Sequence, residues 1–236
     1  MNEISAGILN RVDELRARLI RTSVLILILA VGAYFFRGRV MEIIRYPLDQ
    51  DNLIFIHPTE AFFTYIKVSL FVGVVLGAPF ILFQLIRFFS PQLKGKMGKP
   101  LLFLTFSSGT VFFYLGGGFA LLIMMPFALK FLKGISGENL EAVFTVGNYA
   151  SFVMTFSLVF GFIFEIPVLS YALARAGLLK KRTLISQWRY VLAGTVILAG
   201  ILTPPDPITQ MFLWGPLLFL YGLSILLAGL AELGRR

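Results

Sequence analysis

Residues 149–173, YASFVMTFSLVFGFIFEIPVLSYAL, form a long apolar stretch with a single charged residue, Glu165, two positions before Pro167. A bilayer-spanning helix needs about 20 predominantly apolar residues, so this stretch predicts a transmembrane helix. A carboxylate in hydrocarbon is costly and is retained mainly where it faces a polar cavity, a partner or a translocated species. We therefore treat Glu165 as a candidate functional acid within the membrane. The alternative is an acid that only fixes helix packing.

Five more apolar runs flank this stretch, at residues 19–36, 61–86, 101–129, 190–202 and 208–230. As a helix, the run at 190–202 is ~20 Å long, which is short for a ~30 Å hydrocarbon core, and a re-entrant segment is the alternative there. The connections between the runs leave no room for a separate soluble domain. The pattern predicts an all-α, polytopic integral membrane protein with six transmembrane helices, forming a single membrane domain over residues 1–236.

The composition excludes several classes of protein. The chain is 58% hydrophobic and 14% charged, with a mean hydropathy of +0.86, which a water-soluble domain could not accommodate. The absence of cysteine excludes disulfides, iron–sulfur clusters and thiol catalysis, and the single histidine, His57, lies at no recognisable metal-ligand spacing. There is also no phosphate-binding glycine loop of the GxxxxGK type. We expect no enzymatic activity, no metal and no cofactor.

The distribution of basic residues predicts the orientation in the membrane. The net charge of +9 would suggest nucleic acid for a soluble protein, but here the basic residues lie between hydrophobic runs, so we expect no nucleic-acid partner. In the six-helix arrangement, 15 of the 21 Lys and Arg residues lie on the side of both termini. Short loops rich in these residues stay in the cytoplasm. Both termini are therefore predicted to be cytoplasmic.

A charged segment precedes the first apolar run and includes Glu14, Arg16 and Arg18. Glu14 and Arg18 are four residues apart and share one helix face, which predicts an ion pair worth about 0.3–0.5 kcal/mol. The functional alternative is a carboxylate that binds a basic peptide, because Glu matches the fork of donors on arginine. Taken alone, the spacing favours the ion pair.

Two further patterns predict helix packing and helix capping. Gly73 and Gly77 form a GxxxG motif, which lets two helix backbones approach closely, and internal packing is its expected use. At the start of the second run, Thr59 is the predicted N-cap and Glu60 lies where the helix dipole favours an acid. Capping is the first expectation for these two residues, and a further function the second.

Six short motifs are spread along the chain. The motifs are Glu14-Leu15-Arg16-Ala17-Arg18-Leu19, Pro58-Thr59-Glu60-Ala61-Phe62-Phe63 with Lys67, Phe88-Phe89-Ser90-Pro91 with Leu93, Phe113-Tyr114-Leu115-Gly116 with Pro126, Phe160-Gly161-Phe162-Ile163-Phe164-Glu165-Ile166-Pro167, and Thr203-Pro204-Pro205-Asp206 with Gln210. In this order the motifs resemble those of the TatC family, the signal-peptide receptors of the twin-arginine protein translocase, and the resemblance covers nearly the whole chain. It implies a curved six-helix bundle with two short final helices.

The resemblance also implies a function and its site residues. Members bind twin-arginine signal peptides of folded cargo at the cytoplasmic face, with TatB-like and TatA-like single-span partners in the lipid bilayer, for export driven by the proton-motive force and without an enzymatic reaction. The implied location is the cytoplasmic (inner) membrane of a bacterium or archaeon, and a homo-oligomer is compatible with it. The implied residues are Glu14, Arg16 and Arg18 for signal-peptide binding, Glu165 within the membrane, Pro58, Thr59, Glu60, Lys67, Pro205 and Asp206 on the periplasmic side, and Phe88, Pro91 and Leu93 in the cytoplasmic loop.

The chain departs from the family pattern in three places. Lys96-Met97-Gly98-Lys99 stands where the family usually has an acid that helps to bind the arginine pair, Tyr221-Gly222 where it often has an acid, and Asn10-Arg11 where it has a histidine. Two other functions remain open from the residues alone. One is an ion- or proton-coupled small-solute transporter that uses Glu165 beside the helix-breaking Pro167, and the other is a purely structural subunit.

Overall fold

The computed structural model describes residues 3–48, 53–89, 98–135, 144–202 and 207–234. The helices in these ranges are α1 (Glu3–Phe35), α2 (Arg37–Arg45), η1 (Tyr46–Leu48), α3 (Pro58–Phe89), α4 (Lys99–Phe119), η3 (Ala120–Met124), α5 (Met125–Ile135), α6 (Val146–Arg175), α7 (Lys181–Ser186), α8 (Trp188–Leu202) and α9 (Pro207–Leu233). Five helical segments are long and apolar enough to cross a membrane, and α8 is a shorter apolar helix. The six predicted spans are thus all helical, which confirms the all-α prediction.

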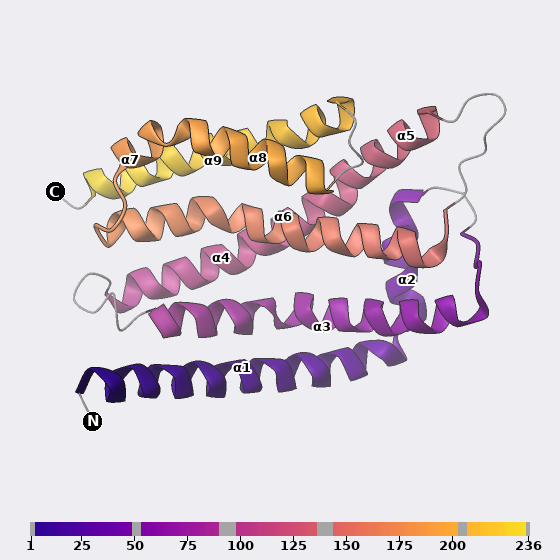
Figure 1. The fold of residues 1–236 in the computed structure, drawn as a ribbon, viewed down its shortest axis with the longest axis horizontal. Helices are drawn as coiled ribbons and strands as arrows, with labels where there is room; N and C mark the ends of the chain where they lie inside the picture. Colours follow the sequence, from indigo (N-terminus) through magenta and orange to yellow (C-terminus); the bar gives the residue numbers. More distant parts are fainter. Residues whose placement is uncertain (1–2, 49–52, 90–97, 136–143, 203–206, 235–236) are drawn as a thin grey trace.

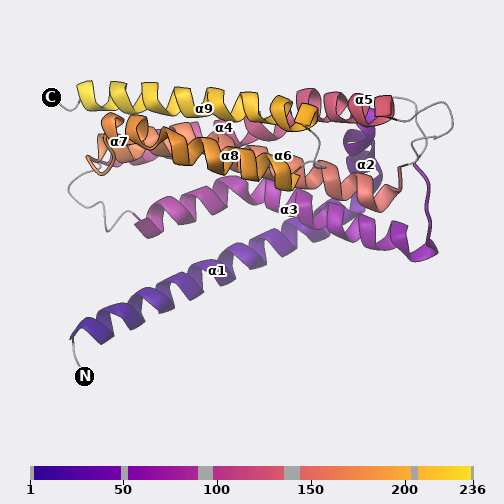
Figure 2. The same cartoon turned by 45° about the horizontal axis from the view of Figure 1, so that its top comes forward.

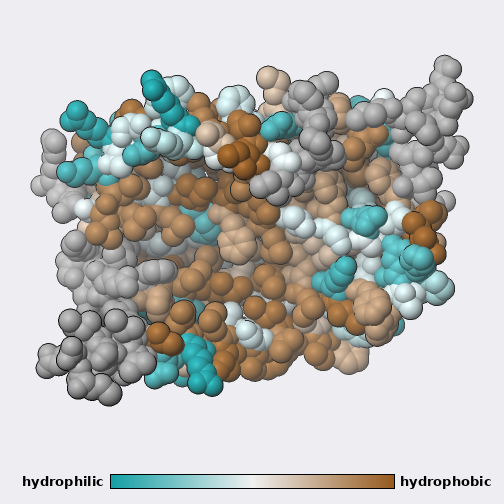
Figure 3. All heavy atoms as spheres, in the orientation of Figure 1, coloured by the Kyte–Doolittle hydropathy of each residue, from teal (hydrophilic) through white to brown (hydrophobic). Residues whose placement is uncertain are grey.

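The long helices lie side by side, and both termini lie at the same end of the bundle (Figure 1). We call this end the terminal end and the other the distal end. The last turns of α3, the first turns of α4 and the short α7 also lie at the terminal end, whereas α2 and α5 lie at the distal end (Figures 1 and 2). Apolar residues cover the middle of the visible face, and hydrophilic residues gather mainly toward the two ends (Figure 3).

Helix α6 is the centre of the bundle, and α1 is the least buried of the five long spans. Half of the most apolar window of α6 is buried inside the protein, against 11% of that of α1. Helix α6 packs against α3, α4 and α9, whereas α1 packs mainly against α3. The N-terminal half of α1 diverges from the other helices in Figure 2. The apolar stretch at residues 149–173, which lies within α6, is therefore the one around which the other spans pack.

Glycines bring α4 and α6 into direct backbone contact. A Cβ atom at Gly116 would overlap the carbonyl oxygen of Phe160 and lie 2.9 Å from Cβ of Phe164. In return, a Cβ atom at Gly161 would lie 2.8 Å from a ring carbon of Phe113. Small residues at such interfaces allow close approach of transmembrane helices, where van der Waals packing is a main source of association energy.

The GxxxG motif of α3 faces α1. A Cβ atom at Gly73 would lie 2.6 Å from the carbonyl oxygen of Ile26, and one at Gly77 would lie 3.4 Å from the Ile26 side chain. The motif therefore serves packing between helices of the same chain, as predicted. Pro79, also in α3, lies inside a continuous helix of 32 residues.

The third crossing extends further than predicted, because its helix reaches Ile135 whereas the predicted run ends at 129. The π-helical turn η3 precedes α5, and the amide of Met125 donates to the carbonyl of Ala120 five residues earlier. Proline lacks an amide hydrogen and clashes with the carbonyl four residues before it, but it is tolerated in the first turn of a helix. Pro126 occupies the first turn of α5, so the crossing reaches Ile135 and does not end at 129.

Helix α2 was absent from the predictions, which left residues 37–60 as a connection. It crosses the distal end of the bundle at a steep angle to the long helices (Figure 1). Its Met41 and Ile44 are buried. The hydroxyl of Tyr149, on α6, donates to the carbonyl of Ile44 at 2.8 Å. Helix α2 therefore closes the distal end and is anchored to the central helix.

The two final helices differ in length. Helix α8 has 15 residues, or ~22 Å, and stays short of a ~30 Å hydrocarbon core, as the sequence predicted. Helix α9 has 27 residues, of which Leu213–Leu233 meet the length and hydropathy of a span. Of the two, α8 matches the short final helices that the resemblance implied, whereas α9 is longer. The two helices pack together, as the side chain of Trp214 donates to the hydroxyl of Thr195 at 3.0 Å.

Candidate functional site

A polar cluster joins α1 to α3 near the terminal end. The guanidinium of Arg18 donates to Oε1 of Glu14 from Nη2 at 2.6 Å and from Nε at 3.2 Å. Its Nη1 donates to Oε1 of Gln84 at 2.9 Å and is 3.4 Å from the Gln84 carbonyl oxygen. The Arg18 side chain is 14% exposed and that of Glu14 is 36% exposed. The arginine is thus held inside the cluster, while the carboxylate lies at its rim.

The structure sorts the predicted signal-binding residues into two groups. Glu14 and Arg18 form the predicted ion pair, whereas Arg16 is exposed and lies outside the cluster. Gln84 was not identified from sequence, although it is the one amide in the apolar run of the second span, and that is the signal that could have found it. Phe88, on α3, follows one turn later and is half-buried. Pro91 and Leu93 lie outside the described residues.

Glu165 is buried on α6 against α4. Its side chain is 5% exposed, and its Oε1 has no hydrogen-bond partner among the described residues. A Cβ atom at Gly109 would lie 2.9 Å from Oε2 of Glu165, so a glycine on α4 makes the room for this carboxyl group. An unpartnered buried polar group costs free energy, and a charged one costs more. The geometry therefore confirms the burial of the acid that sequence predicted within a span.

At the distal end, Glu60 joins α3 to α6. Its Oε1 accepts from the amide of Gly147 at 2.8 Å, and its Oε2 accepts from the amide of Ile56 at 3.0 Å. Gly147 is in the first turn of α6, where amide groups have no partner within the helix. The amide of Val146 also donates to the carbonyl oxygen of Ile54 at 3.1 Å. One carboxylate therefore holds the segment before α3 against the start of α6.

The predicted N-cap at Thr59 is wrong. Helix α3 begins at Pro58, which places Thr59 inside the first turn. Proline is favoured at the first helical position, because the amide group that it lacks would be unpaired there. The expected favourable place of Glu60 in the first turn is confirmed.

A distal pocket of 280 Å³ lies beside Glu60 and includes His57, Lys67 and Asn148 in its lining. It brings together three predicted features of the second span, namely its starting motif, its acid and its lysine. Pro205 and Asp206, which were predicted to share this side, lie outside the described residues.

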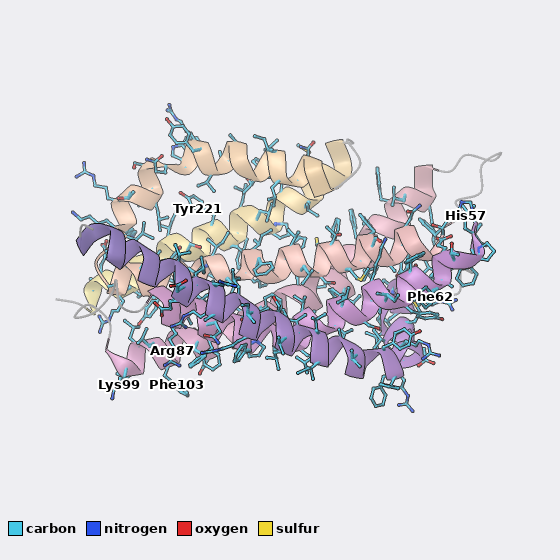
Figure 4. The ribbon with its side chains drawn as sticks, turned by 60° about the horizontal axis from the view of Figure 1, so that its bottom comes forward. His57, Phe62, Arg87, Lys99, Phe103 and Tyr221 are labelled. Atoms are coloured by element: carbon cyan, nitrogen blue, oxygen red, sulfur yellow. The ribbon has the colours of Figure 1, made fainter. Side chains whose placement is uncertain are left out.

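A third set of polar contacts fixes the link between α6 and α8 at the terminal end. Oε1 of Glu232, near the end of α9, accepts from the amide of Lys181 at 2.8 Å and caps α7. The hydroxyl of Tyr221, which Figure 4 labels near this end, donates to the carbonyl of Leu184. The departure from the family pattern at Tyr221 thus has a structural use, because the phenol anchors α7 to α9.

These features define the chain as a multi-pass helical membrane protein with polar clusters at both ends and a buried acid, Glu165, whose Oε1 has no hydrogen-bond partner in the part of the chain that the structure describes. Among the described residues, no group of three or more His, Asp or Glu side chains is placed to hold a metal ion. The candidate site therefore consists of two carboxylates. Glu14 is partly exposed at the terminal end, and Glu165 is buried within a span.

Comparison with known proteins identifies the family. The family model "Sec-independent protein translocase protein (TatC)" matches residues 10–216. A TatC protein of Aquifex aeolicus is 37% identical over 224 residues, covering 92% of each chain, and one of Carboxydothermus hydrogenoformans is 33% identical over 237 residues, covering 97% of this chain and 95% of the relative. A crystal structure entitled Twin Arginine Translocase Receptor TatC, in DDM, superposes with a TM-score of 0.83 at 35% identity, covering 92% of this chain and 99% of the other.

The chain belongs to the TatC family. The family model covers most of its length, and the fold agrees with that of a solved member. This confirms the resemblance drawn from the ordered motifs. The matched proteins are components of protein transport, so the small-solute carrier is not favoured.

Proposed function

We propose that this chain is the receptor subunit of a twin-arginine translocase and binds twin-arginine signal peptides of folded proteins at the cytoplasmic face of the membrane. The observation that carries the proposal is the similarity to a solved twin-arginine translocase receptor over 92% of this chain and 99% of that one. The polar cluster of Glu14, Arg18 and Gln84 supports it, because its rim offers a carboxylate at the end where both termini lie.

The cluster suggests how an incoming arginine is accepted. A guanidinium of the signal peptide and Arg18 compete for the same carboxylate, and each is a fork of donors that matches it. Gln84 already accepts a hydrogen bond from Arg18 at 2.9 Å. Arg18 therefore still has Gln84 as a partner when the Glu14 carboxylate turns to the ligand. The intrachain ion pair is then the resting state of the site, and signal binding exchanges one arginine for another.

The remaining parts of the proposal follow from membership of the family. The chain works in the cytoplasmic membrane of a bacterium or archaeon with both termini in the cytoplasm, which agrees with the excess of basic residues on their side. TatB-like and TatA-like single-span proteins are its partners, and the proton-motive force drives transport. The chain itself performs no enzymatic reaction.

The test is the binding of a fluorescent twin-arginine signal peptide to the purified full chain in detergent, measured by anisotropy against a twin-lysine peptide. We expect Glu14→Gln to weaken binding about tenfold, which corresponds to about 1.4 kcal/mol for a charge-assisted bond at a half-exposed site. Asp13→Asn is the matched control, because it removes an exposed acid one residue away. It is expected to leave the affinity unchanged.

Two results would contradict the receptor function of this cluster. Equal affinity for the twin-arginine and twin-lysine peptides would show that the fork of donors is not recognised. An equal loss in Asp13→Asn and Glu14→Gln would show that only the overall charge matters. Uptake of a small solute driven by a pH gradient in reconstituted vesicles would instead favour the carrier function.

A further inference from the structure

A groove of 280 Å³ lies at the terminal end between the last turns of α3 and the first turns of α4. Its lining residues are Phe83, Ile86, Arg87, Lys99, Leu102, Phe103 and Phe106. Figure 4 shows Arg87, Lys99 and Phe103 close together at this end of the molecule. The groove is separate from the Glu14 cluster and has no part in the contacts described above.

The part of the groove nearest the terminal end carries two cations, Arg87 and Lys99. Arg87 and Lys99 are exposed, and within the described part of the chain neither has a carboxylate partner. Two cations that approach one space from two helices attract an anion, and phosphate is an anion that both side chains bind well.

The part of the groove further from the terminal end is aromatic. The rings of Phe83 and Phe106 pack edge to face with centroids 6.0 Å apart. Phe103 is 71% exposed and Leu104 beside it is 51% exposed, on a helix that crosses the membrane. Large apolar side chains this exposed on a spanning helix meet lipid chains and not water. The groove therefore joins a basic surface to a face in contact with hydrocarbon.

From this combination we infer that the groove binds an anionic phospholipid of the leaflet at the terminal end. The phosphate lies between Arg87 and Lys99, and an acyl chain follows Phe103 and Phe106. A free anion would gain nothing from the aromatic floor, whereas a lipid satisfies both parts at once. The inference stands on this groove alone and does not depend on signal-peptide recognition.

The test measures lipid selectivity at one position of the full chain in bilayers. Because the chain has no cysteine, Leu104→Cys provides a single site for a fluorescent label next to Phe103. Quenching by brominated phosphatidylglycerol is compared with quenching by brominated phosphatidylcholine. A basic residue near a membrane surface is worth about 1 kcal/mol toward an anionic lipid, or about fivefold, so two give about a thirtyfold preference.

Variants separate the groove from general surface charge. On the labelled chain, Arg87→Gln and Lys99→Gln are each expected to reduce the preference about fivefold, and together to remove it. The matched control replaces both Lys180 and Arg182, two exposed cations at the same end, by Gln. This double variant should leave the lipid preference intact. A label at Val111→Cys, 56% exposed and seven residues further along α4, should report no preference.

Three outcomes would overturn the inference. These are equal quenching by the two lipids at position 104, an equal loss in the Lys180/Arg182 control, and abolition of the preference by millimolar glycerol phosphate, which would identify a site for any phosphate. Because all four exchanged cations are exposed, folding is expected to be retained, and circular dichroism of each variant in the same vesicles checks it.

Discussion

Replacing Gly116 by Ala should destabilise the bundle, whereas the same change two residues later should not. A Cβ atom at Gly116 would overlap the carbonyl oxygen of Phe160 and lie 2.9 Å from its carbonyl carbon, and a backbone group cannot rotate away. Forcing atoms into a packed interface costs about 3 kcal/mol at the upper end of the usual range. At Gly118 nothing lies within 4 Å of the added atom.

The expected difference follows from these two environments. Alanine gains up to about 1 kcal/mol over glycine inside a helix at either position. Gly116→Ala is therefore expected to lose about 2 kcal/mol net, and Gly118→Ala to gain up to about 1 kcal/mol. Unfolding in mixed micelles with increasing dodecyl sulfate, followed by circular dichroism, measures both. If the two variants unfold at the same detergent fraction, the direct contact between α4 and α6 is not a determinant of stability.

Three further substitutions test other contacts. Glu60→Gln removes one of two carboxylate acceptors for backbone amides and should lower the thermal midpoint of unfolding, while the exposed Glu42→Gln should leave the midpoint unchanged. Gln84→Ala removes an acceptor of Arg18 and should speed amide exchange in residues 12–20; faster exchange only in α9 would contradict it. Tyr149→Phe removes the hydroxyl that donates to the Ile44 carbonyl of α2 and should make α2 the first site of proteolysis, and an unchanged first cut would count against this anchor.

The six spans could be predicted because membrane helices carry their signal locally. About 20 consecutive apolar residues are required by the thickness of hydrocarbon, whatever the helix packs against. Helix α2 has only nine residues, and Arg37, Arg39 and Arg45 interrupt its apolar residues. A search for long apolar runs therefore passes over it. The extension of the third crossing from 129 to Ile135 was missed for a different reason, because Lys130 and Lys133 interrupt the apolar run there.

The residues of the sites could be named from sequence more easily than their partners. Glu14 and Arg18 are four residues apart, so their pairing follows from helix geometry. Glu60 bonds to Gly147, which is 87 residues away, and only the fold brings the two together. Gln84 meets Arg18 across 66 residues for the same reason. Hydropathy placed Glu165 in a span, but the glycine that makes room for it, Gly109, required the structure.

The π-helical turn between α4 and α5 has a consequence for the faces that the third crossing presents. A helix turns by about 100° per residue, so the one additional residue in the turn shifts the phase of everything after it by that angle. Gly116 before the turn and Met125 after it, both buried, therefore do not follow one regular stripe. The crossing consists of two half-helices out of phase. Deleting one residue at 121 would bring them into phase and rotate the apolar stripe of α5, including its buried Leu129, away from its present neighbours.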